Sequence, residues 1–88
     1  PDTGLLTMLY LIDKPMAEIG LRTAAGDPEA HVVLIQDGVY LTPDIDAPVS
    51  AVARDVAVRG VSLPPDIDRI SYDAVVERLV EQEVKSFV

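Results

Sequence analysis

The sequence predicts a small α/β domain in which a mostly parallel β-sheet is flanked by helices. Its 88 residues are enough for one domain, and their hydrophobic fraction of 49% is enough to form a core. Short, almost wholly apolar segments alternate along the chain with segments of helical spacing. Strands that are apolar on both faces are typical of parallel sheets, which helices cover on both sides.

The first strand is predicted at residues 5–12, which are nearly all apolar and follow Gly4. Residues 1–4 are then a flexible N-terminal extension. Pro15 suits the first turn of a helix, predicted at residues 16–25 and ended by Gly-Asp-Pro at 26–28. The inward face of this helix consists of small or apolar residues, Ala17, Gly20, Leu21 and Ala24.

Residues 31–35 are apolar on both faces and predict an interior strand, and a third strand follows Pro48 at residues 49–53. A short helix at residues 54–59 should end at Gly60, which can adopt a left-handed conformation. A brief fourth strand is expected at residues 69–71.

Ser71 is a suitable N-cap for a helix at residues 72–82, and the helix dipole favours the acidic Asp73 in its first turn. The inward side chains of this helix are expected to be Val75, Val76, Leu79 and Val80. Residues 84–88 can add a last strand at one edge of the sheet.

The tripeptide Gln36-Asp37-Gly38 interrupts the apolar stretch VVLIQDGVYL. It ends the interior strand at the carboxyl edge of the sheet, where open α/β sheets bind ligands. Asp37 could be an acid–base carboxylate, but the favoured interpretation is a turn in which Asp37 bonds its own backbone and Gly38 has positive φ. Asp13-Lys14 follows the first strand at the same edge and could bind an anion or simply form a solvated loop.

Composition argues against several classes of function. The formal net charge is −8 and the seven Lys and Arg residues are scattered, which argues against direct nucleic acid binding. No cysteine is present, so the chain has no thiolate nucleophile, and His31 alone cannot form a metal site. Apolar segments are too short to span a membrane, and no signal peptide is seen, so a cytoplasmic protein is expected. No catalytic, cofactor or metal residues are predicted.

Four segments, MLYLIDKP, VVLIQDGVYL, VARDVAVRGV and RISYDAVVERLVEQE, together resemble the DsrH/TusB family of the DsrE/DsrF/DsrH sulfur-relay proteins. They occur in the family's order, and the resemblance as a whole covers the chain from about Met8 to Phe87. The resemblance implies a flavodoxin-like layout and a hetero-oligomer with DsrE/TusD-like and DsrF/TusC-like paralogues. Such complexes pass persulfide sulfur toward tRNA wobble-uridine 2-thiolation or within sulfur oxidation.

In this group the sulfur-carrying cysteine belongs principally to the DsrE/TusD-type paralogue. Some DsrH members also have a cysteine in the first helix, near the position of Gly20, where this chain has none. The resemblance therefore implies a noncatalytic subunit, at most an accessory to a sulfurtransferase complex. The alternative is a homo-oligomeric small-ligand or regulatory domain on the same fold. The residues expected to face a partner are Asp13, Lys14, Gln36, Asp37, Gly38 and Arg54.

Overall fold

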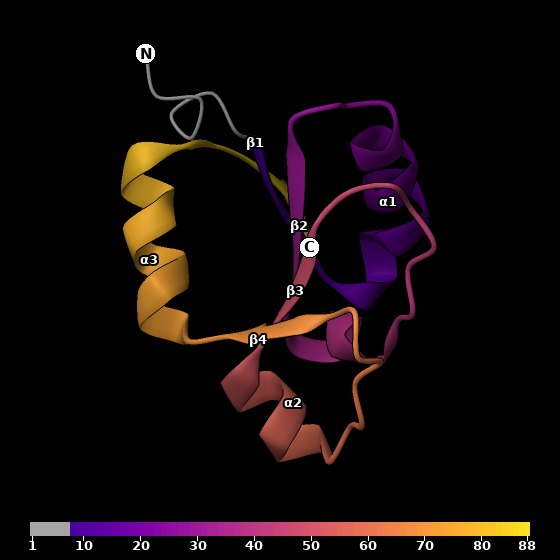
Figure 1. The fold of residues 1–88 in the computed structure, drawn as a ribbon, viewed down its shortest axis with the longest axis vertical. Helices are drawn as coiled ribbons and strands as arrows, with labels where there is room; N and C mark the ends of the chain where they lie inside the picture. Colours follow the sequence, from indigo (N-terminus) through magenta and orange to yellow (C-terminus); the bar gives the residue numbers. More distant parts are fainter. Residues whose placement is uncertain (1–7) are drawn as a thin grey trace.

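A computed structural model describes residues 8–88 and shows one five-stranded, all-parallel sheet with the strand order β4-β3-β2-β1-β5 (Figure 1). The predicted fold class is thereby confirmed. The strands are β1 (Met8–Ile12), β2 (Ala30–Leu34), β3 (Val49–Val52), β4 (Asp68–Ile70) and β5 (Glu83–Phe87). The helices are α1 (Ala17–Ala25), α2 (Ala53–Arg59) and α3 (Tyr72–Glu81), with short 3-10 helices η2 (Lys14–Met16) and η3 (Gln36–Tyr40).

The order of the strands explains why helices cover both faces of the sheet. The chain steps outward from β1 to β4, and α3 then carries it back to β5 on the other side of β1. Crossover connections between parallel strands are right-handed, so connections that run in opposite directions along the sheet place their helices on opposite faces. Accordingly α1 and α3 lie on opposite sides of the sheet (Figure 1).

The face of the sheet toward α1 holds the larger core. Tyr10, Ile12 and Leu34 are fully buried there. The helix lies close to the strands because Gly20 has no side chain, and a Cβ at this position would lie 3.0 Å from Ile12 Cδ1 and Phe87 Cβ. The predicted inward face of α1 is confirmed: Ala17, Gly20 and Ala24 are buried and Leu21 packs partly buried against them.

The opposite face has a smaller core, and α3 covers it only in part. Val75 is the sole buried residue of α3 and packs with Leu9, Val33, Val52 and Ile70. The prediction that Val76, Leu79 and Val80 also point inward holds only in part. Val76 and Leu79 line a cleft between α3 and the sheet but remain 46% and 40% exposed, and Val80 is 84% exposed. α3 stands partly clear of the sheet, so its other large apolar residues are not fully buried.

The sequence signals for the ends of elements are confirmed where backbone chemistry decides them. Ser71 Oγ accepts a hydrogen bond from Ala74 N at 3.1 Å and caps α3. Gly60 ends α2 with a φ of 62°. Pro15 opens a 3-10 turn, after which α1 begins at Ala17. The predicted interior position of β2 and edge position of β5 are confirmed, while the expected extension at residues 1–4 and the start of the first strand at 5–7 lie outside the described residues.

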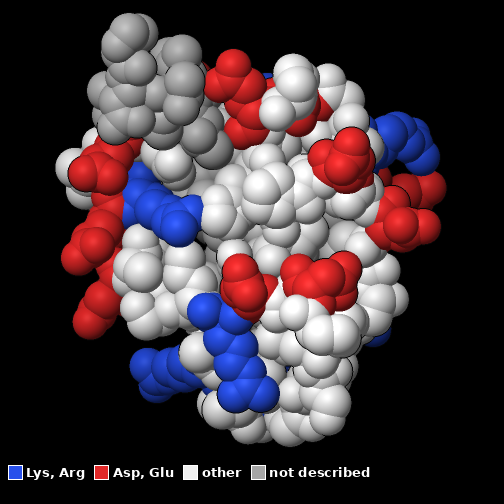
Figure 2. All heavy atoms as spheres, in the orientation of Figure 1, with Lys and Arg blue, Asp and Glu red and all other residues white. Residues whose placement is uncertain are grey.

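Within residues 8–88, no helix has both the length and the apolar composition needed to cross a lipid bilayer. The face in Figure 2 shows acidic side chains distributed around the surface, and its basic side chains do not form one continuous patch.

Candidate functional site at the carboxyl edge of the sheet

The segments after β1, β2 and β3 meet at one edge of the sheet because all three strands run in parallel. The ladder continues one residue past the strands, since Ile35 N donates to Ile12 O at 3.0 Å. Gly38 N then donates to Ile35 O at 2.8 Å in the first turn of η3. The predicted rim residues from the first two strands are thus brought together. They form two adjacent 3-10 helices, η2 and η3, rather than one solvated loop and one tight turn.

The role expected of Gly38 needs correction. This glycine does not have positive φ; the positive-φ residue of η3 is Gln36, at 49°. Gly38 is buried, and a Cβ added to it would overlap with the carbonyl oxygen of Ile12 and lie 3.3 Å from Asp13 Cα. Glycine is required here because two backbone segments approach closely, which no local turn rule reveals.

A network of four residues organises the polar part of this edge. Asp55, in the first turn of α2, accepts a hydrogen bond from Gln36 N at 2.8 Å. Arg59 donates through Nε to Asp37 Oδ1 at 2.9 Å and through Nη1 to Asp55 Oδ1 at 3.4 Å. We call Gln36, Asp37, Asp55 and Arg59 the rim network.

Asp37 does not form the turn that was expected from the sequence, in which its side chain bonds its own backbone. Its carboxylate pairs with Arg59, 22 positions further along the chain, instead of with its own backbone. The hydrogen bond to Asp37 raises the pKa of Arg59, so this guanidinium stays charged. Only the spacing of Asp55 and Arg59, four residues apart on α2, could have been recognised as an ion pair in the sequence.

Gln36 holds a backbone conformation that costs a non-glycine residue about 1–2 kcal/mol. Such conformations persist where the surroundings impose them, and they occur frequently at functional sites. Here the hydrogen bond from Gln36 N to Asp55 and the packing of η3 against β1 impose it.

Asp13 and Lys14 have a structural explanation. Asp13 Oδ1 accepts a hydrogen bond from Lys14 N at 2.6 Å and thereby caps η2, and Asp13 N donates to Phe87 O at 2.9 Å. Its carboxylate therefore stabilises the turn after β1. Lys14 is exposed and forms no ion pair within residues 8–88.

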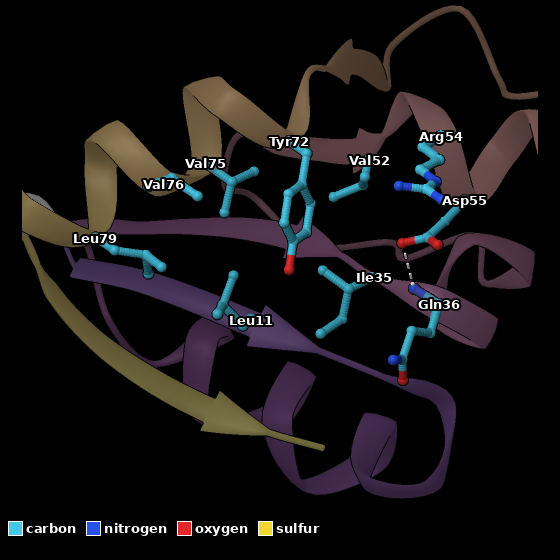
Figure 3. Close-up of a pocket in the computed structure, with 10 residues that line it drawn as sticks. All are labelled: Leu11, Ile35, Gln36, Val52, Arg54, Asp55, Tyr72, Val75, Val76 and Leu79. Carbon is cyan, nitrogen blue, oxygen red and sulfur yellow. Dashed lines mark hydrogen bonds between the residues drawn. The ribbon is translucent and has the colours of Figure 1, made fainter.

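A cleft of about 280 Å³ lies between α3 and the carboxyl ends of the central strands (Figure 3). Its lining is mainly apolar, from Leu11, Ile35, Val52, Val75, Val76 and Leu79, with four polar residues, Gln36, Arg54, Asp55 and Tyr72. Of the predicted rim residues, Gln36 and Arg54 line the cleft, and Asp37 is linked to it through Arg59 and Asp55. Asp13, Lys14 and Gly38 do not line it.

Tyr72 and the apolar residues of α3 were not predicted as part of a site. Tyr72 is the first residue of α3, after the carboxyl end of β4, and its ring reaches across the cleft toward Ile35 (Figure 3). Its position directly after a strand was the available signal, but nothing in the sequence shows that α3 stands partly clear of the sheet.

His31 lies at the opposite end of the sheet, and both of its ring nitrogens have hydrogen-bond partners. Arg78 Nη1 is 2.6 Å from His31 Nδ1, and His31 Nε2 is 3.0 Å from Ser50 Oγ. A guanidinium can only donate, so Nδ1 accepts and the proton resides on Nε2, which donates to Ser50. Burial, and then the charge of Arg78, lower the pKa of His31, with Asp68 opposing. His31 cannot act as a base toward Ser50 in this arrangement.

In the described part of the chain, no three His, Asp or Glu side chains gather in a group that could hold a metal ion. No protein-family model and no curated protein sequence matches the chain.

Proposed function

We propose that this chain is a noncatalytic subunit of the DsrH/TusB type in a sulfur-relay complex, with DsrE/TusD-like and DsrF/TusC-like paralogues as its partners. The observation that carries the proposal is the rim network, a set of fixed charges at the carboxyl edge of the sheet in a chain without cysteine. The network lies within two of the segments that resemble the family, VVLIQDGVYL and VARDVAVRGV.

Sulfur relay requires a thiolate, because the persulfide forms on a nucleophilic sulfur. The cysteine-free chain therefore contributes by binding and orienting the partner that carries the sulfur. The same contribution serves tRNA wobble-uridine 2-thiolation or sulfur oxidation, since both pass the persulfide through the partner's cysteine.

The Asp37 carboxylate is suited to contact a partner. Its side chain is 59% exposed, whereas that of Arg59 is only 22% exposed. Arg59 thus holds Asp37 in one orientation at the surface, and a fixed charge of this kind determines the register of an interface and favours the correct partner.

The test is co-purification with the paralogues encoded beside the gene, using Asp37→Asn. Asparagine retains the shape of the side chain but loses the charge, so we expect an unchanged melting temperature and an affinity for the partner about tenfold lower, equivalent to about 1.4 kcal/mol. Glu18→Gln is the matched control, because Glu18 is also an exposed carboxylate paired with an arginine, Arg22, but lies on α1.

A second readout follows the sulfur itself. After incubation of the complex with a cysteine desulfurase and labelled cysteine, the label should appear on the DsrE/TusD-like partner and not on this chain. Failure to form a complex, or unchanged affinity of Asp37→Asn, would contradict the proposed role of the rim. Covalent label on this chain would contradict its noncatalytic assignment.

The alternative, a homo-oligomeric small-ligand or regulatory domain, is favoured by the cleft beneath α3, which is mainly apolar and has a polar end. Neighbouring genes discriminate between the two functions, since DsrE-like and DsrF-like neighbours support the relay complex. The mass of the isolated chain in solution, measured by light scattering, tests self-association.

A further inference from the structure

The cleft beneath α3 is polar at one end and apolar at the other. In Figure 3 the lining side chains extend from Leu79 and Val76 at one end, past Tyr72, to Arg54 and Asp55 at the other. The apolar end lies beneath the part of α3 whose side chains stay exposed, with Val76 at 46% and Leu79 at 40%. The cleft also opens near the carboxyl ends of the parallel strands, the edge at which open α/β sheets bind ligands.

Two hydrogen-bond donors in the cleft have no partner within residues 8–88. The Arg54 guanidinium forms no ion pair or hydrogen bond there, and the Tyr72 hydroxyl forms no hydrogen bond. Asp55, the acidic residue of the lining, is already occupied by Gln36 N and by Arg59. The charge left available to a ligand at the polar end is therefore positive.

We propose that this cleft binds a linear amphipathic carboxylate, with the carboxylate on Arg54 and the hydrocarbon chain directed toward Leu79. The proposal goes beyond the function above and does not depend on assembly with paralogues. A carboxylate gives the Arg54 guanidinium a charge-assisted partner, while the chain covers Leu11, Val76 and Leu79. The volume of about 280 Å³ is at the lower limit for ligand pockets, which restricts the ligand to a short chain.

Other ligand classes complement this cleft less well. A neutral hydrocarbon leaves Arg54 without a partner, and an alkylammonium would place a cation beside Arg54. The protein as a whole carries a net charge of −8, which repels anions and attracts cations. Preference for a carboxylate over an amine of equal length must then come from the local charge of Arg54, so this comparison is a stringent test.

The experiment is a titration of the ¹⁵N-labelled protein, followed by amide chemical shifts, with three probes of equal chain length: octanoate, octan-1-ol and octylammonium. We expect saturable shifts for octanoate at residues that line the cleft, and binding at least about tenfold weaker for the other two. Arg54→Gln should weaken octanoate binding at least about tenfold and leave octan-1-ol binding unchanged.

Arg69→Gln is the matched control, because Arg69 is also exposed and forms no ion pair within residues 8–88. Unlike Arg54, it lines a second pocket, together with His31 and Arg78. It should leave octanoate binding unchanged, and the spectra of both free variants report whether the fold is retained. Leu79→Asp, which puts a charge at the apolar end, should weaken binding of octanoate and of octan-1-ol. Equal binding of octanoate and octan-1-ol, equal effects of the two arginine variants, or no saturation by octanoate below its micelle concentration would overturn the proposal.

Discussion

The close approach of η3 to the end of β1 predicts that Gly38→Ala is among the most damaging single-methyl changes in this protein. The added Cβ would overlap with the Ile12 carbonyl oxygen and lie 3.3 Å from Asp13 Cα. Both contacts are backbone atoms, so no side chain can rotate away to relieve them. The turn after β2 must instead move away from β1, and the bond from Ile35 N to Ile12 O, 3.0 Å long, lies within the segment that must move.

Overpacking of this kind typically costs 1–3 kcal/mol, and contact with backbone places this substitution at the upper end, about 3 kcal/mol. For a domain of this size each kcal/mol lowers the melting temperature by roughly 4–8 °C, so a decrease of roughly 12–24 °C is expected. Thermal melts by circular dichroism and urea titrations of the same samples measure both quantities.

Two other glycines provide controls with the same chemical change. Gly26→Ala should cost nothing and can stabilise by about 0.4–1 kcal/mol, because its φ is −87° and the nearest atom to a Cβ, Thr23 O, is 3.7 Å away. Gly60→Ala has open space but a φ of 62°, and should cost about 1–2 kcal/mol. If Gly38→Ala melts within a few degrees of the natural protein, or above Gly60→Ala, the close approach of the two backbones is refuted.

Three further results are expected. Gln36→Gly should raise the free energy of unfolding by about 0.5 kcal/mol in urea titrations, since relief of the strain at φ 49° slightly exceeds the added chain entropy of glycine. Stability should fall as the pH decreases below 6.5, the ordinary pKa of histidine. The pKa of His31 is lowered in the folded protein, so below pH 6.5 the unfolded chain binds a proton that the folded chain does not. One such group changes the free energy of unfolding by at most about 1.4 kcal/mol per pH unit. His31→Gln should remove that part of the pH dependence, and an unchanged profile would contradict the lowered pKa. Val80→Ser, at a side chain 84% exposed, should weaken self-association in light scattering without lowering the melting temperature.

The sequence by itself determined the elements and the class of the fold. Apolar segments without alternation identified strands buried on both faces, and the small residues Ala17, Gly20 and Ala24 identified the side of α1 that packs on the sheet. Ser71 and Gly60 marked the start of α3 and the end of α2, because capping depends on backbone groups only a few residues away. The sequence also placed Gln36 and Arg54 at the carboxyl edge of the sheet, because residues that follow neighbouring parallel strands lie at the same edge.

Only the tertiary structure decided the contents of the candidate site. Asp37 and Arg59 pair across 22 positions, and Gly38 meets the backbone of β1, because β2 happens to lie between β1 and β3 and brings those segments together. Periodicity correctly identified an apolar stripe on α3, but it could not show that only Val75 reaches the core and that a cleft remains. Burial depends on how closely a helix approaches the sheet, and this approach is a property of the assembled layers rather than of any local segment.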